Sequence, residues 1–140
     1  MYASQADMVQ RFGEQELLEL TDRDGSQHAI VAAVLEGALS DASALIDGYL
    51  AGRYPLPLSS VPRVLVALCC DLARYALYDE RASEQIEKRK TDALRFLEQL
   101  AKGAITLGLD KDGETVASSD LTEFQSAGSV FGRQQAKGFL

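Results

Sequence analysis

The segment from about Gln27 to Leu50 constrains the fold most, because it has the pattern of one long helix with very little polar surface. Its polar side chains form one narrow stripe, at spacings of four, three and four: Glu36, Ser40, Ser43 and Asp47. Apolar residues occupy the remaining circumference, which predicts burial on most sides. Glycines inside a helix, here Gly37 and Gly48, cost roughly 1 kcal/mol each relative to alanine. We therefore expect close approach by other helices and predict the central helix of a bundle.

Two short helices are predicted before the central one. Ser4 begins the first, with Asp7 at its third position in an acidic variant of the capping box, and Gly13 ends it. A helical turn, "EQELLEL", follows at residues 14–20. "TDRDGS", at residues 21–26, then predicts a turn in which Asp24 or Ser26 caps the central helix.

The stretch "GRYPLPL", residues 52–58, predicts a rigid corner after the central helix. Gly52 lets the helix end. Pro55 and Pro57 fix φ and favour an extended path for the residues that precede them. Tyr54 is expected to pack around the bend together with Tyr49. Four residues are predicted to form a structural corner, with direct contact to a partner protein as the alternative: Gly52, Tyr54, Pro55 and Pro57.

Two further helices complete the predicted bundle. Ser59 or Ser60 is expected to cap the first of them, with Pro62 in its first turn, and Ser83 to cap the second, which Gly103 ends. Local ion pairs are predicted between Asp71 and Arg74 and between Glu84 and Lys88. The expected fold is mainly α: about four to five helices around a central long helix, over residues 1–103.

Residues 104–140 have a different character and are predicted to form a C-terminal arm that partners order. Ile105, Leu107 and Leu109 alternate with other residues before a "DKDG" turn, so a β-hairpin is one candidate form. The last seventeen residues hold isolated aromatics and bases but no acid. Aromatic and arginine side chains are common anchors at protein interfaces. The candidate partner-binding residues are Phe124, Phe131, Arg133, Lys137 and Phe139.

Charge and motifs argue against several functions. The 140-residue chain has a net charge of −7, which opposes gripping duplex DNA through its phosphates. The adjacent Cys69 and Cys70 favour buried thiols in a reducing cytoplasm. We find neither a signal peptide nor an apolar run of membrane-spanning length. His28 is the single histidine, and "DRDGS" and "DKDGE" fail as calcium loops, because the first and last ligand positions are not acidic. No catalytic, cofactor or metal site, and no enzyme, is therefore predicted.

An ordered series of motifs resembles the Mu-like prophage head-to-tail connector family, the adaptor or head-completion proteins of long-tailed phages. The series consists of the Met-Tyr start, "RFG" at 11–13, "LTDRDG" at 20–25, "DASALIDGYLAGRYPLPL" at 41–58 and "CDLARYALY" at 70–78, with a looser match to "VFGRQQAKGF" at 130–139. The resemblance implies a virion structural protein, a small helical bundle in a ring at the neck between head and tail.

The same resemblance implies the partners and brings no catalytic residues. They are further copies of the chain in a cyclic ring, the portal protein, and a stopper or tail-terminator protein, with DNA passing through the channel without specific binding. Assembly in the bacterial host cytoplasm, without a membrane, is implied. The alternative hypothesis is a small acidic phage regulatory protein that binds a host protein and is absent from purified virions.

Overall fold

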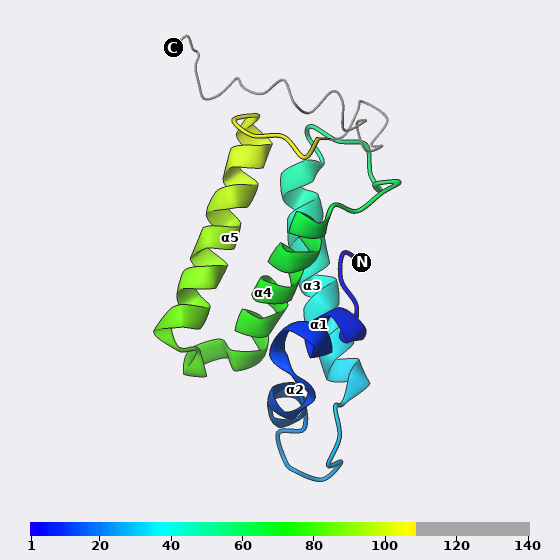
Figure 1. The fold of residues 1–140 in the computed structure, drawn as a ribbon, viewed down its shortest axis with the longest axis vertical. Helices are drawn as coiled ribbons and strands as arrows, with labels where there is room; N and C mark the ends of the chain where they lie inside the picture. The colour runs from blue at the N-terminus through cyan, green and yellow to red at the C-terminus, as the bar shows by residue number, and fades with distance from the viewer. Residues whose placement is uncertain (109–140) are drawn as a thin grey trace.

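The computed structural model describes residues 1–108, which form a helical bundle (Figure 1). Its elements are α1 (Gln5–Phe12), α2 (Glu14–Thr21), α3 (Ala32–Leu50), α4 (Arg63–Tyr78), the 3-10 turn η1 (Asp79–Arg81) and α5 (Glu84–Lys102). The three long helices α3, α4 and α5 run up, down and up along the long axis, and the short α1 and α2 pack against α3 and α4. The mainly α bundle predicted from the sequence is thus confirmed.

The core lies between the three long helices and under α1 and α2. Its fully buried large side chains are Met8, Leu17, Leu35, Leu39, Ile46, Leu50, Leu65, Leu97 and Leu100. Burying one such side chain contributes roughly 1.5–3 kcal/mol. Cys69 and Cys70 lie in the same core as free thiols, which confirms the prediction of buried cysteines.

The two short N-terminal helices begin and end as predicted. The Asp7 N–H donates to Ser4 Oγ at 3.3 Å, and the Ser4 N–H donates to Asp7 Oδ2 at 2.9 Å, which completes the capping box. Gly13, at φ +89°, ends α1 and leads directly into α2. A side chain at this φ is strained, so glycine suits the junction.

The central helix α3 begins at Ala32, five residues later than predicted, with Val31 at its N-cap. Neither Asp24 nor Ser26 caps it. Instead, the buried Asp22 carboxylate accepts hydrogen bonds from the N–H groups of Gln27, at 3.1 Å, and His28, at 2.8 Å. These bonds hold residues 22–31 as a loop, so the helix begins only at Ala32.

A second correction concerns the start of α4. The helix begins at Arg63, with Pro62 at the N-cap and no side-chain cap, so the predicted serine cap is wrong. Proline is tolerated here because the N–H groups of the first turn have no partner inside the helix. Ser83 caps α5, and Gly103, at φ +82°, ends it, as predicted.

The predicted local ion pairs are also wrong. Arg74 binds Glu16 of α2 rather than Asp71, and Asp71 lies 3.4 Å from Arg89 of α5. Lys88 pairs with Asp92, at 2.8 Å, rather than with Glu84. Packing of α4 against α2 and α5 thus decides the partners of Arg74 and Asp71, whereas Lys88 keeps a local partner four residues further along α5.

Candidate interaction surfaces

Tyr54 joins the corner after α3 to the core and to the segment after α5. The N–H groups of Arg53 and Tyr54 both donate to the Leu50 carbonyl, at 2.9 Å, and wind the chain one turn beyond the helix. The half-buried Tyr54 packs against the core, and its hydroxyl accepts a hydrogen bond from the Leu107 N–H at 3.0 Å. This bond joins the corner to the segment after α5.

The remaining corner residues lie on the surface. Gly52 is exposed, its φ is not positive, and a Cβ built on it meets nothing within 4 Å. Pro55 and Pro57 are exposed as well, and the Leu56–Pro57 peptide bond is cis. The corner therefore combines a packed tyrosine with an accessible proline rim.

Only part of the α3 surface is covered, which corrects the prediction that the helix is buried on most sides. Val34 remains 37% exposed and Leu45 43% exposed, although both are large and apolar. They lie on one face with Gly37, Asp41, Ala44 and Gly48, all of which are exposed. We call this set the α3 face: Val34, Gly37, Asp41, Ala44, Leu45 and Gly48.

The glycines of the α3 face have open space in front of them. A Cβ built on Gly37 or Gly48 meets nothing within 4 Å. The predicted close approach by helices of the same chain is therefore wrong, because α4 and α5 pack against the opposite side of α3.

The N-terminal residues cover part of the predicted polar stripe of α3. The Tyr2 N–H donates to Ser43 Oγ at 3.0 Å, and the Tyr2 hydroxyl donates to Asp47 Oδ1. Burial, reinforced by the bond to Asp47, raises the pKa of Tyr2 well above its usual range. Ser43 and Asp47 thus bind the chain start, and the exposed acids of α3 are Glu36 and Asp41.

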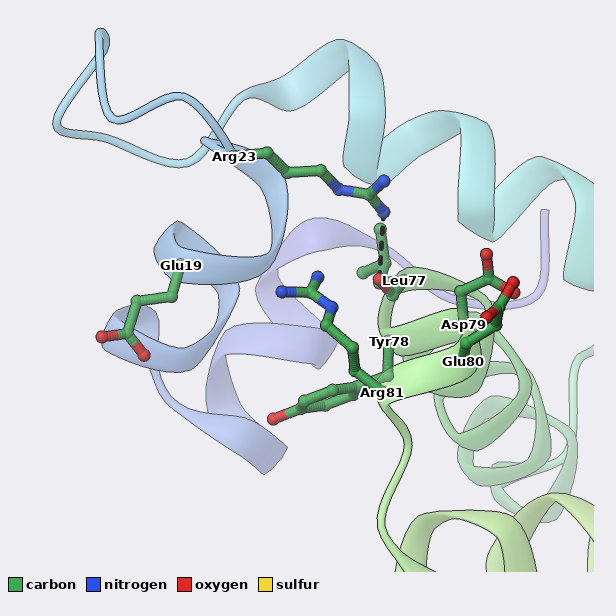
Figure 2. Close-up of a pocket in the computed structure, with 7 residues that line it drawn as sticks. All are labelled: Glu19, Arg23, Leu77, Tyr78, Asp79, Glu80 and Arg81. Atoms are coloured by element: carbon green, nitrogen blue, oxygen red, sulfur yellow. Dashed lines mark hydrogen bonds between the residues drawn. The ribbon is translucent and has the colours of Figure 1, made fainter.

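A surface hollow of about 300 Å³ lies where α2 meets the end of α4 (Figure 2). Its lining residues are Glu19, Arg23, Leu77, Tyr78, Asp79, Glu80 and Arg81. Arg23 reaches from the loop after α2 and donates from its guanidinium group to the Leu77 carbonyl at 3.0 Å. This arginine thereby satisfies a carbonyl at the C-terminal end of α4. With charges of both signs and no nucleophile–base pair in its lining, the hollow suits polar contacts better than covalent chemistry.

The described residues show neither a metal-binding cluster nor a membrane span. Residues 1–108 hold no group of three or more His, Cys, Asp or Glu side chains placed to bind a metal ion. Among the helices of the same residues, none has the length and apolarity to cross a bilayer. His28 is exposed in the loop before α3, with its backbone N–H bound to Asp22.

The predicted partner-binding residues of the arm lie outside the described residues. These are Phe124, Phe131, Arg133, Lys137 and Phe139, and the predicted hairpin also lies mostly beyond Gly108. Sequence reasoning missed the α3 face as a surface. The signal was present, because glycines and alanines recur there beside Val34 and Leu45, but it was interpreted as internal packing.

Comparison with known proteins gives one consistent result. The model of the family described as "Bacteriophage Mu, Gp36" matches residues 2–126. The "Mu-like prophage FluMu protein gp36" of Haemophilus influenzae is 45% identical over 140 residues, covering 100% of this chain and 99% of the relative. "Gene product J" of Escherichia phage Mu is 40% identical over 142 residues, covering 99% of each. The chain therefore belongs to the bacteriophage Mu Gp36 family.

Proposed function

We propose that this protein is a virion structural protein of the phage neck, a head–tail connector that forms a ring between the portal and the tail or stopper. The observation that carries the proposal is the end-to-end similarity to phage Mu proteins, since 99–100% of the chain aligns with both relatives. The connector role itself is supported by the ordered motifs from the Met-Tyr start to "CDLARYALY", which resemble the connector family.

The shape of the bundle supports a ring. A closed ring repeats one heterologous contact, so each subunit needs two different side surfaces. The α3 face supplies an apolar and acidic surface on one side of the bundle, and the outer side of α5 supplies a densely charged one, with Lys88, Glu98 and Lys102 exposed (Figure 1). The bundle thus offers two different side surfaces for the contacts between adjacent subunits.

The acidic charge supports passage of DNA without retention. The net charge of −7 is multiplied by the number of subunits in a ring. A channel wall of the same sign as the phosphates repels them, whereas tight binding needs clustered Lys and Arg. DNA is therefore expected to pass through the channel without specific binding.

The arm supplies the contacts with other proteins of the neck. Phe124, Phe131 and Phe139 are suited to pockets on the portal or on a neighbouring subunit, with Arg133 and Lys137 beside them. A stopper or tail-terminator protein is the expected partner on the tail side of the ring. The isolated chain is then expected to be monomeric or weakly associated.

Mass spectrometry of purified particles tests the proposal. A connector is present in every virion, in a fixed ratio to the portal. A regulatory protein that binds a host protein is absent from virions and is recovered in a complex with its target. A deletion of Phe124–Leu140 provides a genetic test, which is expected to leave the bundle folded and to block the joining of heads to tails. Normal virions from this deletion would contradict the role of the arm.

A further inference from the structure

We propose that the α3 face is the receiving surface for the C-terminal segment Phe124–Leu140 of a neighbouring copy of this chain. This inference rests on the proposed ring, because the ring supplies the neighbouring copy. It goes beyond that proposal by naming both sides of one contact between subunits.

The α3 face is apolar enough to need a cover. Val34 and Leu45 are 37% and 43% exposed, on a helix whose opposite side lies in the core. Gly37, between them, and Gly48, just beyond Leu45, leave the helix backbone accessible, since nothing lies within 4 Å of a Cβ built on either. A flat aromatic ring can then lie against the backbone between two large apolar side chains. Such aromatic contacts dominate the binding energy of many interfaces.

The charge of the face selects among possible occupants. The α3 face carries one acid, the exposed Asp41, which forms no ion pair or hydrogen bond within residues 1–108. No Lys or Arg occurs in α3. A second α3 face would therefore bring like charges together, which is unfavourable. The segment Phe124–Leu140 carries Arg133 and Lys137 and no acidic side chain, so its charge is complementary.

The end of the described chain lies close to one end of the face. The Leu107 N–H donates to the Tyr54 hydroxyl in the corner that follows α3, so the chain leaves the bundle beside the C-terminal end of that helix. The 19 residues of α3 span about 28 Å. A seventeen-residue segment is long enough to follow the whole helix when extended.

The linker favours a face on another copy. Fifteen residues, 109–123, separate the described chain from Phe124, and they reach up to about 50 Å when extended. The subunit's own face starts at the point where the linker begins, so binding there needs no such length. The linker also holds five acids, among them Asp110 and Glu123, against the single Lys111. Folding it back beside Asp41 of the same helix would bring like charges together.

The test is a titration of the isotope-labelled full chain with a synthetic peptide of residues 124–140, followed by nuclear magnetic resonance. We expect saturable shifts of the backbone signals from the α3 face and none with a peptide of scrambled sequence. Lack of saturation, or shifts confined to another surface such as α5, would overturn the proposal. Shifts that appear only when the chain's own Phe124, Phe131 and Phe139 are replaced by serine would also overturn it. They would show that, in the unchanged chain, the α3 face is occupied by the segment of the same chain.

A double variant, and then a pair of variants, separate effects on peptide binding from effects on folding. In Gly37→Ala combined with Gly48→Ala, the new methyl groups have room in the free bundle and favour the helix, so the unfolding temperature should rise by about 5 °C. The same methyl groups should weaken peptide binding about tenfold, because they occupy the space of the ring. A stabilised variant with unchanged affinity would contradict the proposal.

The pair of variants is matched in charge. Asp41→Lys on the α3 face and Glu98→Lys on α5 alter the net charge equally, at exposed positions. Asp41→Lys should weaken peptide binding about tenfold, and Glu98→Lys should leave it within about twofold. Equal effects would show general attraction to an acidic protein and overturn the assignment. Because the titration uses purified protein, it can fail while particle analysis still finds the chain in virions, so the two proposals fail separately.

Discussion

Arg74 of α4 binds Glu16 of α2 through two hydrogen bonds, although 58 residues separate them in the sequence. The Arg74 Nε lies 2.7 Å from Glu16 Oε2, and a terminal nitrogen of its guanidinium group lies 3.1 Å from Oε1. The guanidinium carbon also lies 4.3 Å from the centroid of the Phe12 ring. One arginine thus fixes both short helices against the long bundle.

This pair predicts a measurable coupling. Both side chains are largely buried, at 17% and 23% exposure, so water screens the pair only in part. A double-mutant cycle with Arg74→Ala and Glu16→Ala, followed by urea unfolding, should give a coupling free energy of about 1 kcal/mol. The exposed Lys88–Asp92 pair is the control, and its cycle should give no coupling above error. Equal couplings would contradict the role of burial.

Replacement of Asp22 tests the loop before α3. Asp22→Ala removes the acceptor of the Gln27 and His28 N–H groups and should lower the free energy of unfolding by about 2 kcal/mol. Asp24→Ala, two residues away at an exposed position, is the control with a smaller effect. Chemical denaturation of both variants checks the difference. A larger loss in the Asp24 variant would show that the local turn, rather than the buried carboxylate, holds the loop.

The corner predicts a local effect. Tyr54→Phe keeps the packed ring but removes the acceptor of the Leu107 N–H, at a cost of about 1 kcal/mol. Amide exchange at Leu107 should accelerate about fivefold. Tyr49→Phe is the matched control, because the Tyr49 hydroxyl has no hydrogen-bond partner within residues 1–108. Unchanged exchange at Leu107 in the Tyr54 variant would count against the link between corner and arm.

The buried thiols predict loss of stability in alkali. Burial raises the pKa of Cys70 to about 12 and also raises the pKa of Cys69. In the unfolded chain a thiol ionises near pH 8.5. The neutral thiols therefore favour the folded state fully below that pH, and the contribution is lost as pH rises toward the folded pKa.

Urea unfolding between pH 7.5 and 9.5 measures this effect. The free energy of unfolding should fall with increasing pH above about 8.5. The slope approaches about 1.4 kcal/mol per pH unit for each thiol that is fully ionised in the unfolded chain and neutral in the folded protein. Cys70→Ala should make the decline shallower, although the cavity lowers its stability at every pH. A free energy that rises over this range, or an unaltered slope in the variant, would contradict the assigned cause.

Local sequence signals predicted the local structure well. Ser4 with Asp7, Gly13, Ser83 and Gly103 mark helix ends through bonds or φ values that involve only nearby residues. The start of α3 was missed because Asp24 and Ser26 have the chemistry of a cap, while the bonds of Asp22 determine the loop. Side-chain pairing was missed for a similar reason. Periodicity identifies partners within one helix, whereas packing between helices places Glu16 beside Arg74.

The small residues of α3 show the other limit of sequence reasoning. Glycine inside a helix indicates close approach by something, but it does not identify the approaching element. The prediction assigned that element to the same chain, and the structure leaves Gly37 and Gly48 open. The arm residues Phe124, Phe131, Arg133, Lys137 and Phe139 remain predictions, since they lie outside residues 1–108.

A ring of this protein at the neck of the virion should be visible in an electron-microscopy map of the joint between head and tail. We expect a closed ring of density between portal and tail. The bundle of α3, α4 and α5 should fit each unit of this ring, with the DNA channel along its axis. A neck fully explained by other proteins, in particles that lack this chain, would contradict it.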